Sequence, residues 1–535
     1  MRLHSIVDNI PDDACISSVI PLSYTPSDES DMRLFLSDKV CTSMDKAAST
    51  IMFNCEKDYV TRCQTDLNAN AVYEPVTHPE ADIVAHSNAF GVRYGFTLDN
   101  RNQDTPYYKA IDKMHKLPHP GSRFISSSAT SHLKLVSLFL NILFNALSLD
   151  IDALFGVRMA SMGISAEWAS RSWVLQNTAQ LIPLLEVWNT QYAQHTDTPP
   201  SLRCHDFERL YTNIETADME LSIMQLIGRI FDMDKHANHV AIKVWETKPA
   251  VWLKQNQVPA TDEARSGSGH GGKFMIFDEA TIEIWLTFLL SNMYVRFGDQ
   301  IFRQIQGTPM GTNCASNLAN FYLTSYELRF LGRLAAVYLD VTLAFLHDLV
   351  SCIVRAFLFT ARYIDDLLSI SNPYLHHLMY YTQYLHHPRI LGIYPTTLSV
   401  TTAASGHTVD YMDISVQPQP GSVSRLTTVL FDKREHQPLK SLFIIKFLHA
   451  SSNISNTAKY GIITSQYHRL RRIIMLRADF TYRMADVVSY MRSKGHDVPR
   501  MMQQVQSLCH RYLELYGTHP SHIYQQIQDA LAGMG

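Results

Sequence analysis

Two adjacent carboxylates, Asp365 and Asp366, stand in the tetrapeptide Tyr363-Ile364-Asp365-Asp366. Adjacent carboxylates repel each other, so the pair is costly to hold together unless a cation lies between them. Consecutive side chains of a strand point to opposite faces, and both acids can therefore approach one ion only near a hairpin turn. An exposed acidic pair at a strand end would look the same, so further acids are needed to predict a metal site.

A third acid, Asp206, ends a short strand-like run in SLRCHDFERLYTNI and precedes a predicted helix with an apolar stripe. The stripe consists of Ile223, Leu226, Ile227 and Ile230. A lone Asp before a helix is usually a cap or a solvated acid. Tyr211, five residues after Asp206, favours another interpretation. A polymerase that selects deoxynucleotides needs a bulky ring beneath the sugar, because the 2′-hydroxyl is the only difference to be rejected.

Two glycines, Gly307 and Gly311, flank Pro309 in QIQGTPMGTNC, ahead of a predicted helix. Residues Ala315, Leu318, Ala319 and Tyr322 fall on one face of that helix. Without a Cβ the backbone can lie flat against a base pair or a sugar, and Pro309 stiffens the loop. A tight turn before a helix would explain both glycines equally well, but it would not explain their position between the acidic segments.

These segments, in this order, resemble motifs A, B and C of reverse transcriptases. The stretches DFERLYTNI, GTPMGTNCASNLANFYLTSYE and RYIDDLLSI are most similar to the telomerase-related, Penelope-like group of retroelement enzymes and their cellular relatives. KMHKLPHPGSRFIS resembles the group's finger motif, WVLQNT the stretch before motif A, VDYMDISV with FDKRE the end of the palm, and YGIITSQYHRLRRI the start of the thumb. The resemblance covers roughly residues 80–535.

The resemblance implies an α+β fold of the right-hand polymerase type, with fingers, a palm built on an antiparallel sheet, and a helical thumb. We expect an accessory, mostly irregular or helical region over residues 1–105, fingers over 106–200, a palm over 201–437 and a thumb over 438–535. A Gly- and Ser-rich insertion at 262–273 is predicted to be a flexible loop. Gly298-Asp299 is predicted to be a hairpin turn, and Ile463, Tyr467, Leu470 and Ile474 form an apolar thumb stripe.

The implied activity is that of an RNA-directed DNA polymerase, which extends a primer 3′-hydroxyl on an RNA or DNA template with deoxynucleoside triphosphates. Two Mg²⁺ ions, or Mn²⁺, would activate the hydroxyl and stabilise the departing pyrophosphate. Asp206 and Asp365 are then expected to bridge the metals, with Asp366 as a weaker third ligand and the Phe207 carbonyl as a backbone ligand.

The resemblance also assigns binding residues. Lys116 and Arg123 are expected to grip the triphosphate, and Gln304 and Gly307 to line the nucleotide and template pocket with Tyr211. For Lys433 a role near the primer and a salt bridge at a strand end are equally compatible with the sequence. Backbone contacts are expected from four thumb arginines, although a solvated helix face would look similar: Arg469, Arg471, Arg472 and Arg477.

Bulk composition alone would not suggest a nucleic-acid partner. The 535 residues include 46 Lys and Arg against 50 Asp and Glu, a net charge of −4, and only 18% are charged. The basic residues concentrate near Lys113–Arg123 and Arg469–Arg477. We therefore expect weak, salt-sensitive nonspecific binding, and tight binding only with a defined primer and template or a partner protein.

The remaining features indicate an intracellular protein, nuclear or cytoplasmic. Eight Cys without regular spacing are typical of reduced thiols, and the acidic start MRLHSIVDNIPDDAC does not resemble a signal peptide. Polar residues interrupt the apolar stretches 133–149 and 335–360, so both are predicted to be buried helices and no membrane span is expected.

Other functions are compatible with parts of this pattern. An RNA-dependent RNA polymerase would share the palm, but Tyr211 and Tyr363 argue against it, because that class usually has small residues there. A domesticated, non-catalytic nucleic-acid-binding protein is the alternative from another class. Nothing after Gly517 resembles the GIY-YIG nuclease of Penelope-like elements, so self-contained cutting of DNA is not expected, and a separate endonuclease or host protein is a candidate partner. The oligomeric state and the role of residues 1–105 stay open.

Overall fold

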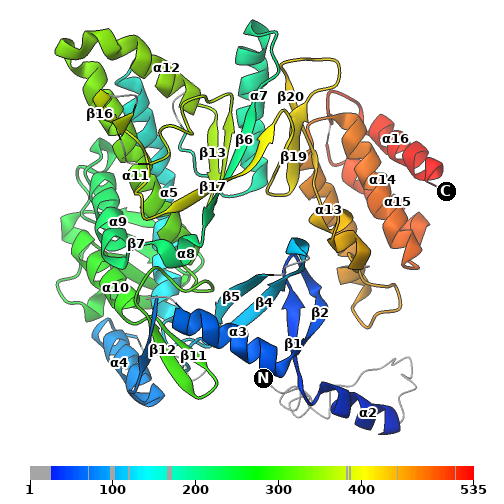
Figure 1. Ribbon diagram of the computed structural model, residues 1–535, viewed down its shortest axis with the longest axis horizontal. Coiled ribbons are helices and arrows are strands. Elements are labelled where there is room, and N and C mark those ends of the chain that lie inside the picture. Colours follow the sequence, from blue (N-terminus) through cyan, green and yellow to red (C-terminus); the bar gives the residue numbers. More distant parts are fainter. Residues whose placement is uncertain are drawn as a thin grey trace.

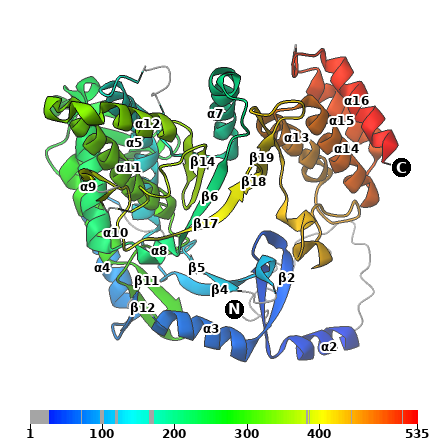
Figure 2. The same ribbon diagram turned by 45° about the horizontal axis from the view of Figure 1, so that its top comes forward.

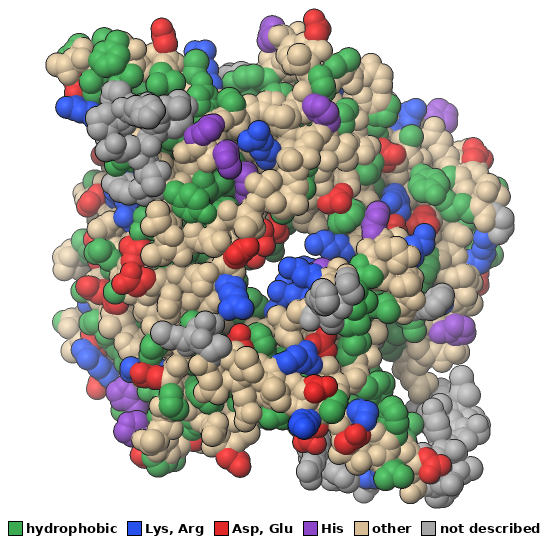
Figure 3. All heavy atoms as spheres, viewed as in Figure 1, with side chains coloured by type: hydrophobic (Ala, Val, Ile, Leu, Met, Phe, Trp, Pro, Cys, Tyr) green, Lys and Arg blue, Asp and Glu red, His purple; other side chains and the backbone are tan. Residues whose placement is uncertain are grey.

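The computed structural model describes residues 26–69, 72–96, 103–117, 121–164, 171–380, 383–384, 387–442, 444–512 and 514–534. Helices and strands are mixed throughout. A sheet backed by a helical body, a second sheet at the bottom of the view and a helical bundle at the right surround a central hollow (Figures 1 and 3). We refer to these parts, in this order, as the palm, the fingers and the thumb.

The palm sheet is antiparallel and has the strand order β13-β14-β6-β17. Its strands are β13 (Thr360–Tyr363), β14 (Asp366–Ile370), β6 (Leu202–Glu208) and β17 (Ser399–Gly406). Side chains alternate between the two faces of a strand. Phe207 and Leu367 lie on the face that packs on the helical body, while Cys204 and Leu368 lie on the face toward the thumb.

The helical body consists of α5 (Lys134–Ala160), α9 (Thr216–Phe231), α10 (Glu279–Ser291), α11 (Ala315–Leu339) and α12 (His347–Phe357). These helices share one apolar cluster with the palm sheet. The stripe predicted after Asp206 is buried in α9, and the predicted face of the next motif is buried in α11. Both helices therefore hold the site-bearing loops at their N-terminal ends against one core.

Helix α5 is the one helix of the described residues that is long and apolar enough to cross a membrane, judged by length and composition alone. It packs among α9, α10 and α11, with Leu140, Leu143 and Phe144 fully buried. The second predicted apolar stretch is divided between α11 and Val341–Phe357, which are bent by 108°. Both stretches are mainly helical, as predicted, but they are buried only in part. In the second stretch Leu339, Val341 and Phe345 are exposed.

The fingers are built on the strand order β3-β12-β11-β4-β5. The strands are β3 (Tyr73–Val76), β12 (Gln300–Gln304), β11 (Tyr294–Phe297), β4 (Tyr107–Lys113) and β5 (Gly121–Ser127). The hairpin predicted at Gly298-Asp299 joins β11 to β12. Strand β3 comes from the N-terminal region, which therefore contributes to the fingers sheet.

The rest of the described N-terminal region is helical, as expected, with a strand pair that the sequence did not reveal. Its elements are α2 (Pro26–Leu36), β1 (Lys39–Met44), β2 (Ala47–Cys55), α3 (Glu56–Ala69) and α4 (Glu80–Arg93). Strands β1 and β2 form an antiparallel hairpin that lies beside β4 (Figure 2). The alternation in β1 is weak, because residues on both of its faces are only partly buried.

The prediction of a flexible Gly- and Ser-rich loop at 262–273 is wrong. The segment forms β9 (Ser266–Gly269), which pairs with β10 (Gly272–Phe277). With β7 (Ala241–Trp245) and β8 (Val251–Leu253), these strands make a separate sheet, β8-β7-β10-β9. Backbone pairing needs no side chains, and the Phe274 ring covers Gly267, where a Cβ would lie 2.7 Å from the ring. Composition alone could not reveal this partner.

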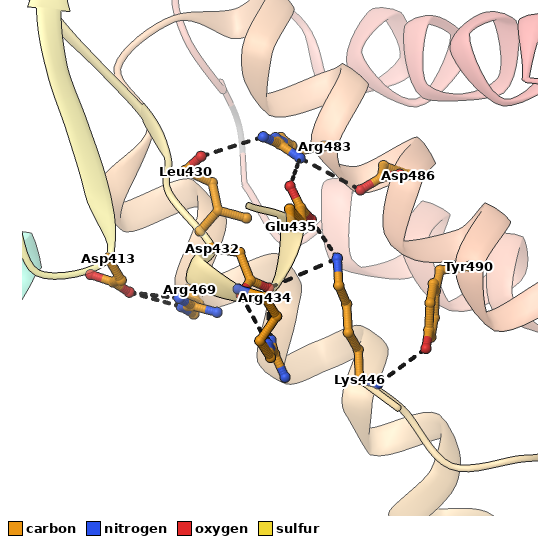
Figure 4. A network of polar contacts seen from close by, with 10 residues as sticks. All are labelled: Asp413, Leu430, Asp432, Arg434, Glu435, Lys446, Arg469, Arg483, Asp486 and Tyr490. Atoms are coloured by element: carbon orange, nitrogen blue, oxygen red, sulfur yellow. Dashed lines mark hydrogen bonds and ion pairs between the residues drawn. The ribbon is translucent and has the colours of Figure 1, made fainter. Parts of the chain in front are cut away.

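The thumb contains α13 (Asn456–Ile473), α14 (Arg477–Ser493), α15 (Val498–Cys509) and α16 (Pro520–Gly533). All four residues of its predicted apolar stripe are buried. The stripe packs against β18 (Val409–Tyr411), β19 (Ile414–Pro418) and β20 (Leu426–Leu430). Charged contacts reinforce this junction: Arg469 lies 2.7 Å from Asp413, and Glu435 binds both Lys446 and Arg483 (Figure 4).

A fully buried ion pair connects the palm sheet to the helical body. Arg362 of β13 and Glu327 of α11 are both 0% exposed, and Arg362 Nε lies 2.6 Å from Glu327 Oε1. The guanidinium also donates to Asn320 Oδ1 and Thr324 Oγ1 of α11 and to the Ile364 carbonyl in the turn after β13. Burial alone would lower the pKa of Arg362, but Glu327 raises it above its usual value. The turn is therefore fixed to α11 by a satisfied charge.

We predict that Arg362→Met and Glu327→Gln each lower the free energy of unfolding by about 3–5 kcal/mol, because each leaves a buried charge without its partner. The double variant should lose clearly less than the sum of the two single variants. Urea unfolding of the full chain measures all three. Arg303→Met is the control, since the Arg303–Glu74 pair is exposed and should cost less than about 1 kcal/mol. Additive losses in the double variant would contradict this account.

Candidate active site

The turn between β13 and β14 carries the acidic pair. Tyr363 pairs with Asp366, so Ile364 and Asp365 form a two-residue hairpin loop. Ile364 has a φ of +55°, a conformation that β-branched residues rarely adopt. Its carbonyl accepts a hydrogen bond of 3.0 Å from Arg362, which helps to hold the strained turn. The hairpin position predicted for the pair is confirmed.

Strand register brings the third acid to this turn. Asp206 of β6 and Asp366 of β14 are direct cross-strand partners, so both side chains lie on the same face of the sheet. The Phe207 N–H donates to the Asp365 carbonyl at 3.1 Å. The next pair along, Asp206 with Asp366, is therefore of the non-hydrogen-bonded kind, in which side chains approach most closely. Three carboxylates that are distant in sequence meet at one edge of the palm sheet.

All three carboxylates have a raised pKa. Burial, followed by repulsion from Asp365 and Asp206, raises the pKa of Asp366 to about 6. Burial and the Asp365 charge raise the pKa of Asp206, and burial raises the pKa of Asp365. Like charges held this close favour either a proton or a metal cation between them.

The donor set fits Mg²⁺ or Mn²⁺ better than a soft metal, because it consists of carboxylate oxygens. In the part of the chain that is described, no group of three or more His, Cys, Asp or Glu side chains is placed so that it could hold a metal ion by itself. An open site is nevertheless compatible with Mg²⁺, which keeps waters and shares its remaining positions with substrate phosphates. Asp206 and Asp365, with Asp366, are the residues that could hold such ions.

Five cations surround the acids, and we call them the cation ring: Lys46, Lys113, Lys116, Arg123 and Lys433. Each acid has cations that oppose the rise in its pKa. For Asp206 these are Lys116 and Lys113. For Asp365 they are Arg123, Lys46 and Lys113, and for Asp366 they are Lys433 and Lys46. Acidic and basic side chains accordingly face each other across the central hollow (Figure 3). The ring places positive charge beside the acids, an arrangement that suits an anionic ligand such as a polyphosphate.

Two members of the ring were not predicted. Lys113 ends β4 and lies in the same KMHK segment as Lys116, so the finger motif could have indicated it. Lys46 lies in the turn between β1 and β2 and has no motif around it. Lys116 lies in the short helix η1 (Met114–Lys116), Arg123 in β5, and Lys433 in η9 (Lys433–Glu435).

The two glycines of the loop before α11 are required by protein backbone. A Cβ on Gly307, which has a φ of +72°, would lie 2.0 Å from the Tyr211 carbonyl oxygen. A Cβ on Gly311, at φ +123°, would lie 2.0 Å from the Ser126 carbonyl oxygen. The loop is thus clamped between the segment after β6 and finger strand β5. The sequence suggested that these glycines let the backbone approach a nucleotide. The close approach of the Tyr211 and Ser126 carbonyl oxygens is sufficient to explain why glycine is needed at both positions.

Two other predicted residues lie at the same junction. Gln304 is 1% exposed, and its side-chain amide donates to the Gln306 carbonyl at 2.8 Å and faces the Tyr211 carbonyl at 3.5 Å. Gln304 therefore stabilises the loop before α11 by a hydrogen bond to its backbone. Tyr211 follows a sharp turn at Arg209, which has a φ of +48°. Burial, followed by the charges of Asp365 and Tyr363, raises the pKa of Tyr211, so its hydroxyl is within electrostatic reach of Asp365.

The predicted nucleic-acid-binding residues are in diverse surroundings. Arg469 pairs with Asp413, Arg471 stacks on Tyr512 at 4.1 Å from the ring centroid, and Arg477 donates to Thr518. Arg472 and Lys433 are exposed, and neither has an ion pair among the described residues. The salt bridge considered for Lys433 is instead made by its neighbour Arg434, with Asp432 at 2.8 Å (Figure 4).

Comparisons with known proteins identify the fold. No protein-family model matches this sequence, and no curated protein matches it by sequence. The structure of telomerase from Candida albicans in complex with a TWJ fragment of telomeric RNA is similar with a TM-score of 0.52 at 9% identity, over 93% of this chain and 72% of that chain. Apo telomerase from Candida tropicalis aligns over 95% of this chain and 76% of that chain, at 8% identity and a TM-score of only 0.42. The predicted polymerase-like α+β fold is thereby confirmed.

We predict that Gly307→Ala destabilises the chain by at least about 2 kcal/mol, because it adds a steric collision to the strain of a positive φ. The matched control is Gly298→Ala in the β11–β12 turn. Gly298 also has a positive φ, +61°, but a Cβ at this position would have no atom within 4 Å. This control should cost only about 1 kcal/mol. Thermal unfolding of both variants tests the clamp, and equal losses would contradict it.

Proposed function

We propose that this protein is a reverse transcriptase, an RNA-directed DNA polymerase that extends a primer 3′-hydroxyl with deoxynucleoside triphosphates. One observation carries the proposal: Asp206 and Asp366 are cross-strand partners beside the hairpin turn that carries Asp365. Three converging carboxylates, facing a ring of cations, match what nucleotidyl transfer needs. The carboxylates suit divalent metals, and the cations suit a polyphosphate.

The residues have distinct roles in this proposal. Asp206 and Asp365 would hold two divalent ions, assisted by Asp366 and the Phe207 carbonyl; the ions, when bound, would activate the primer hydroxyl and neutralise charge on the leaving pyrophosphate. Lys116 and Arg123 orient the triphosphate so that its α-phosphorus faces the hydroxyl. The primer oxygen forms the new bond to that phosphorus as the bond to pyrophosphate breaks.

The nature of the template is also a proposal. The telomerase from Candida albicans was solved with a fragment of telomeric RNA, which supports RNA as a partner of this chain as well. The sequences of the motifs are most similar to those of the Penelope-like group, which supports a retroelement enzyme or a cellular relative of one. Two exposed basic residues are proposed to contact the backbone of the primer or template. They are Lys433 of the cation ring and Arg472 of the thumb.

We expect primer extension to test the activity directly. The full chain, with Mg²⁺ or Mn²⁺, should incorporate deoxynucleotides on an RNA template, and Asp365→Asn should reduce the rate by at least about 1000-fold because a metal ligand is lost. Asp299→Asn is the control, since that exposed acid lies in the β11–β12 turn of the fingers. The proposal fails if the wild-type chain incorporates no more than Asp365→Asn, an outcome that would favour a non-catalytic binding protein.

Tyr211 provides a test of sugar selection. Asp365 acts on the pKa of Tyr211, and Tyr211 follows the strand that carries Asp206, so the ring would be near the sugar of a triphosphate held at these acids. Replacing it with Ala opens space for a 2′-hydroxyl, and we predict that Tyr211→Ala improves ribonucleotide use relative to deoxynucleotide use by about 10–100-fold. Tyr211→Phe, which keeps the ring, should retain wild-type selection. If the kcat/KM ratio for the two sugars stays the same in Tyr211→Ala, Tyr211 is not the selective residue.

A further inference from the structure

The turn of the β1–β2 hairpin reaches the centre of the molecule. Met44 pairs with Ala47, so Asp45 and Lys46 form its two-residue turn, with Lys46 at a φ of +66°. The Lys46 side chain is exposed, and no carboxylate of the described residues lies within ion-pair distance of its ammonium group. A cation without its own partner is therefore presented on a fixed backbone.

The fingers hold this turn from one side. The Asp45 N–H donates to the Asp112 carbonyl of β4 at 3.1 Å. The Asp45 carboxylate lies 3.6 Å from the Arg123 guanidinium and 3.9 Å from the His115 ring. The residue preceding Lys46 is thus tied to the strands that carry Lys113 and Arg123, on either side of Lys116.

The segment between palm and thumb holds the turn from the other side. Met44 and Ala47, which flank the turn, are buried in a small apolar cluster with Leu439, against which Met114 and Ile444 also pack. The hairpin thus bridges the fingers and the start of the thumb. Contacts on both sides therefore hold the backbone of Lys46 in place more firmly than the backbone of a lysine in an unsupported surface loop.

The electrostatics agree with this placement. The pKa of His115 is lowered to about 4, and burial is the main cause. Asp45 opposes this change, whereas Lys433, Lys46 and Lys116 contribute to it. One lysine from the N-terminal hairpin, one from the fingers and one from the palm therefore converge on the same region.

We propose that Lys46 binds the polyphosphate of the incoming nucleoside triphosphate, so that the N-terminal hairpin forms part of the active site. This inference rests on the function proposed above and deepens it. An ammonium group is a compact donor that suits phosphate oxygens. The polyphosphate is favoured over primer or template backbone because Asp45 anchors the turn to Arg123 and His115 of the fingers, not to the thumb helices.

The experiment compares Lys46→Gln with Lys57→Gln in the full chain. Lys57 is an exposed lysine on α3, so its variant removes the same charge from the same region. Binding of Mg²⁺–dTTP is measured by calorimetry, KM for dTTP by primer extension, and binding of a primer–template duplex by fluorescence anisotropy. Lys46→Gln should weaken dTTP binding and raise its KM by about tenfold, with Lys46→Arg restoring most of the loss. Duplex binding should change by less than about twofold.

Each outcome is decisive. If Lys46→Gln binds dTTP as well as Lys57→Gln does, the inference is overturned while the proposed function stands. If duplex binding weakens and dTTP binding does not, the hairpin contacts nucleic acid and the polyphosphate assignment is overturned. If the wild-type chain neither binds dTTP nor extends a primer, the proposed function itself has failed, and the inference with it.

Discussion

The buried ion pair between Arg362 and Glu327 is the constraint on which the candidate site depends. Two unexposed charges are costly unless each is fully hydrogen-bonded, and here the guanidinium reaches Glu327, Asn320, Thr324 and the Ile364 carbonyl. Tyr394 donates to the same carboxylate at 2.8 Å. The strained turn that presents Asp365 is thereby fixed to α11, whose N-terminal loop is in turn clamped on the segment that carries Tyr211.

From this anchor, sheet register completes the site. A shift of one residue between β6 and β14 would move Asp206 to the opposite face from Asp366, so pairing specifies which acids can meet. The cation ring then compensates a concentration of negative charge that the palm alone could not tolerate. Its members come from the N-terminal hairpin, the fingers and the palm, which explains how a chain with a net charge of −4 can still concentrate positive charge around the acids.

The sequence predicts those elements whose signals are local. The stripe on α9, the hairpin at Gly298-Asp299 and the turn carrying Asp365 all follow from periodicity or turn chemistry. Prediction fails where partners are distant. Composition indicates a loop where a glycine-rich strand forms. No motif marks Lys46, because the position of its turn depends on packing of Met44 and Ala47 against Leu439 and on the ion pair between Asp45 and Arg123. Likewise, the sequence shows Arg362 only as a residue beside the acidic motif, since nothing local indicates that Glu327 is its partner.

The central claim is that Asp206 and Asp365 jointly hold the divalent ions of the reaction. The most direct measurement is a crystal structure with Mn²⁺, a primer–template and an unreactive deoxynucleoside triphosphate analogue, in which anomalous scattering locates the metal. The account predicts two peaks about 3.5–4 Å apart between these carboxylates, both touching the triphosphate. A triphosphate bound without metal at Asp206 and Asp365, or Mn²⁺ bound only elsewhere, would contradict it.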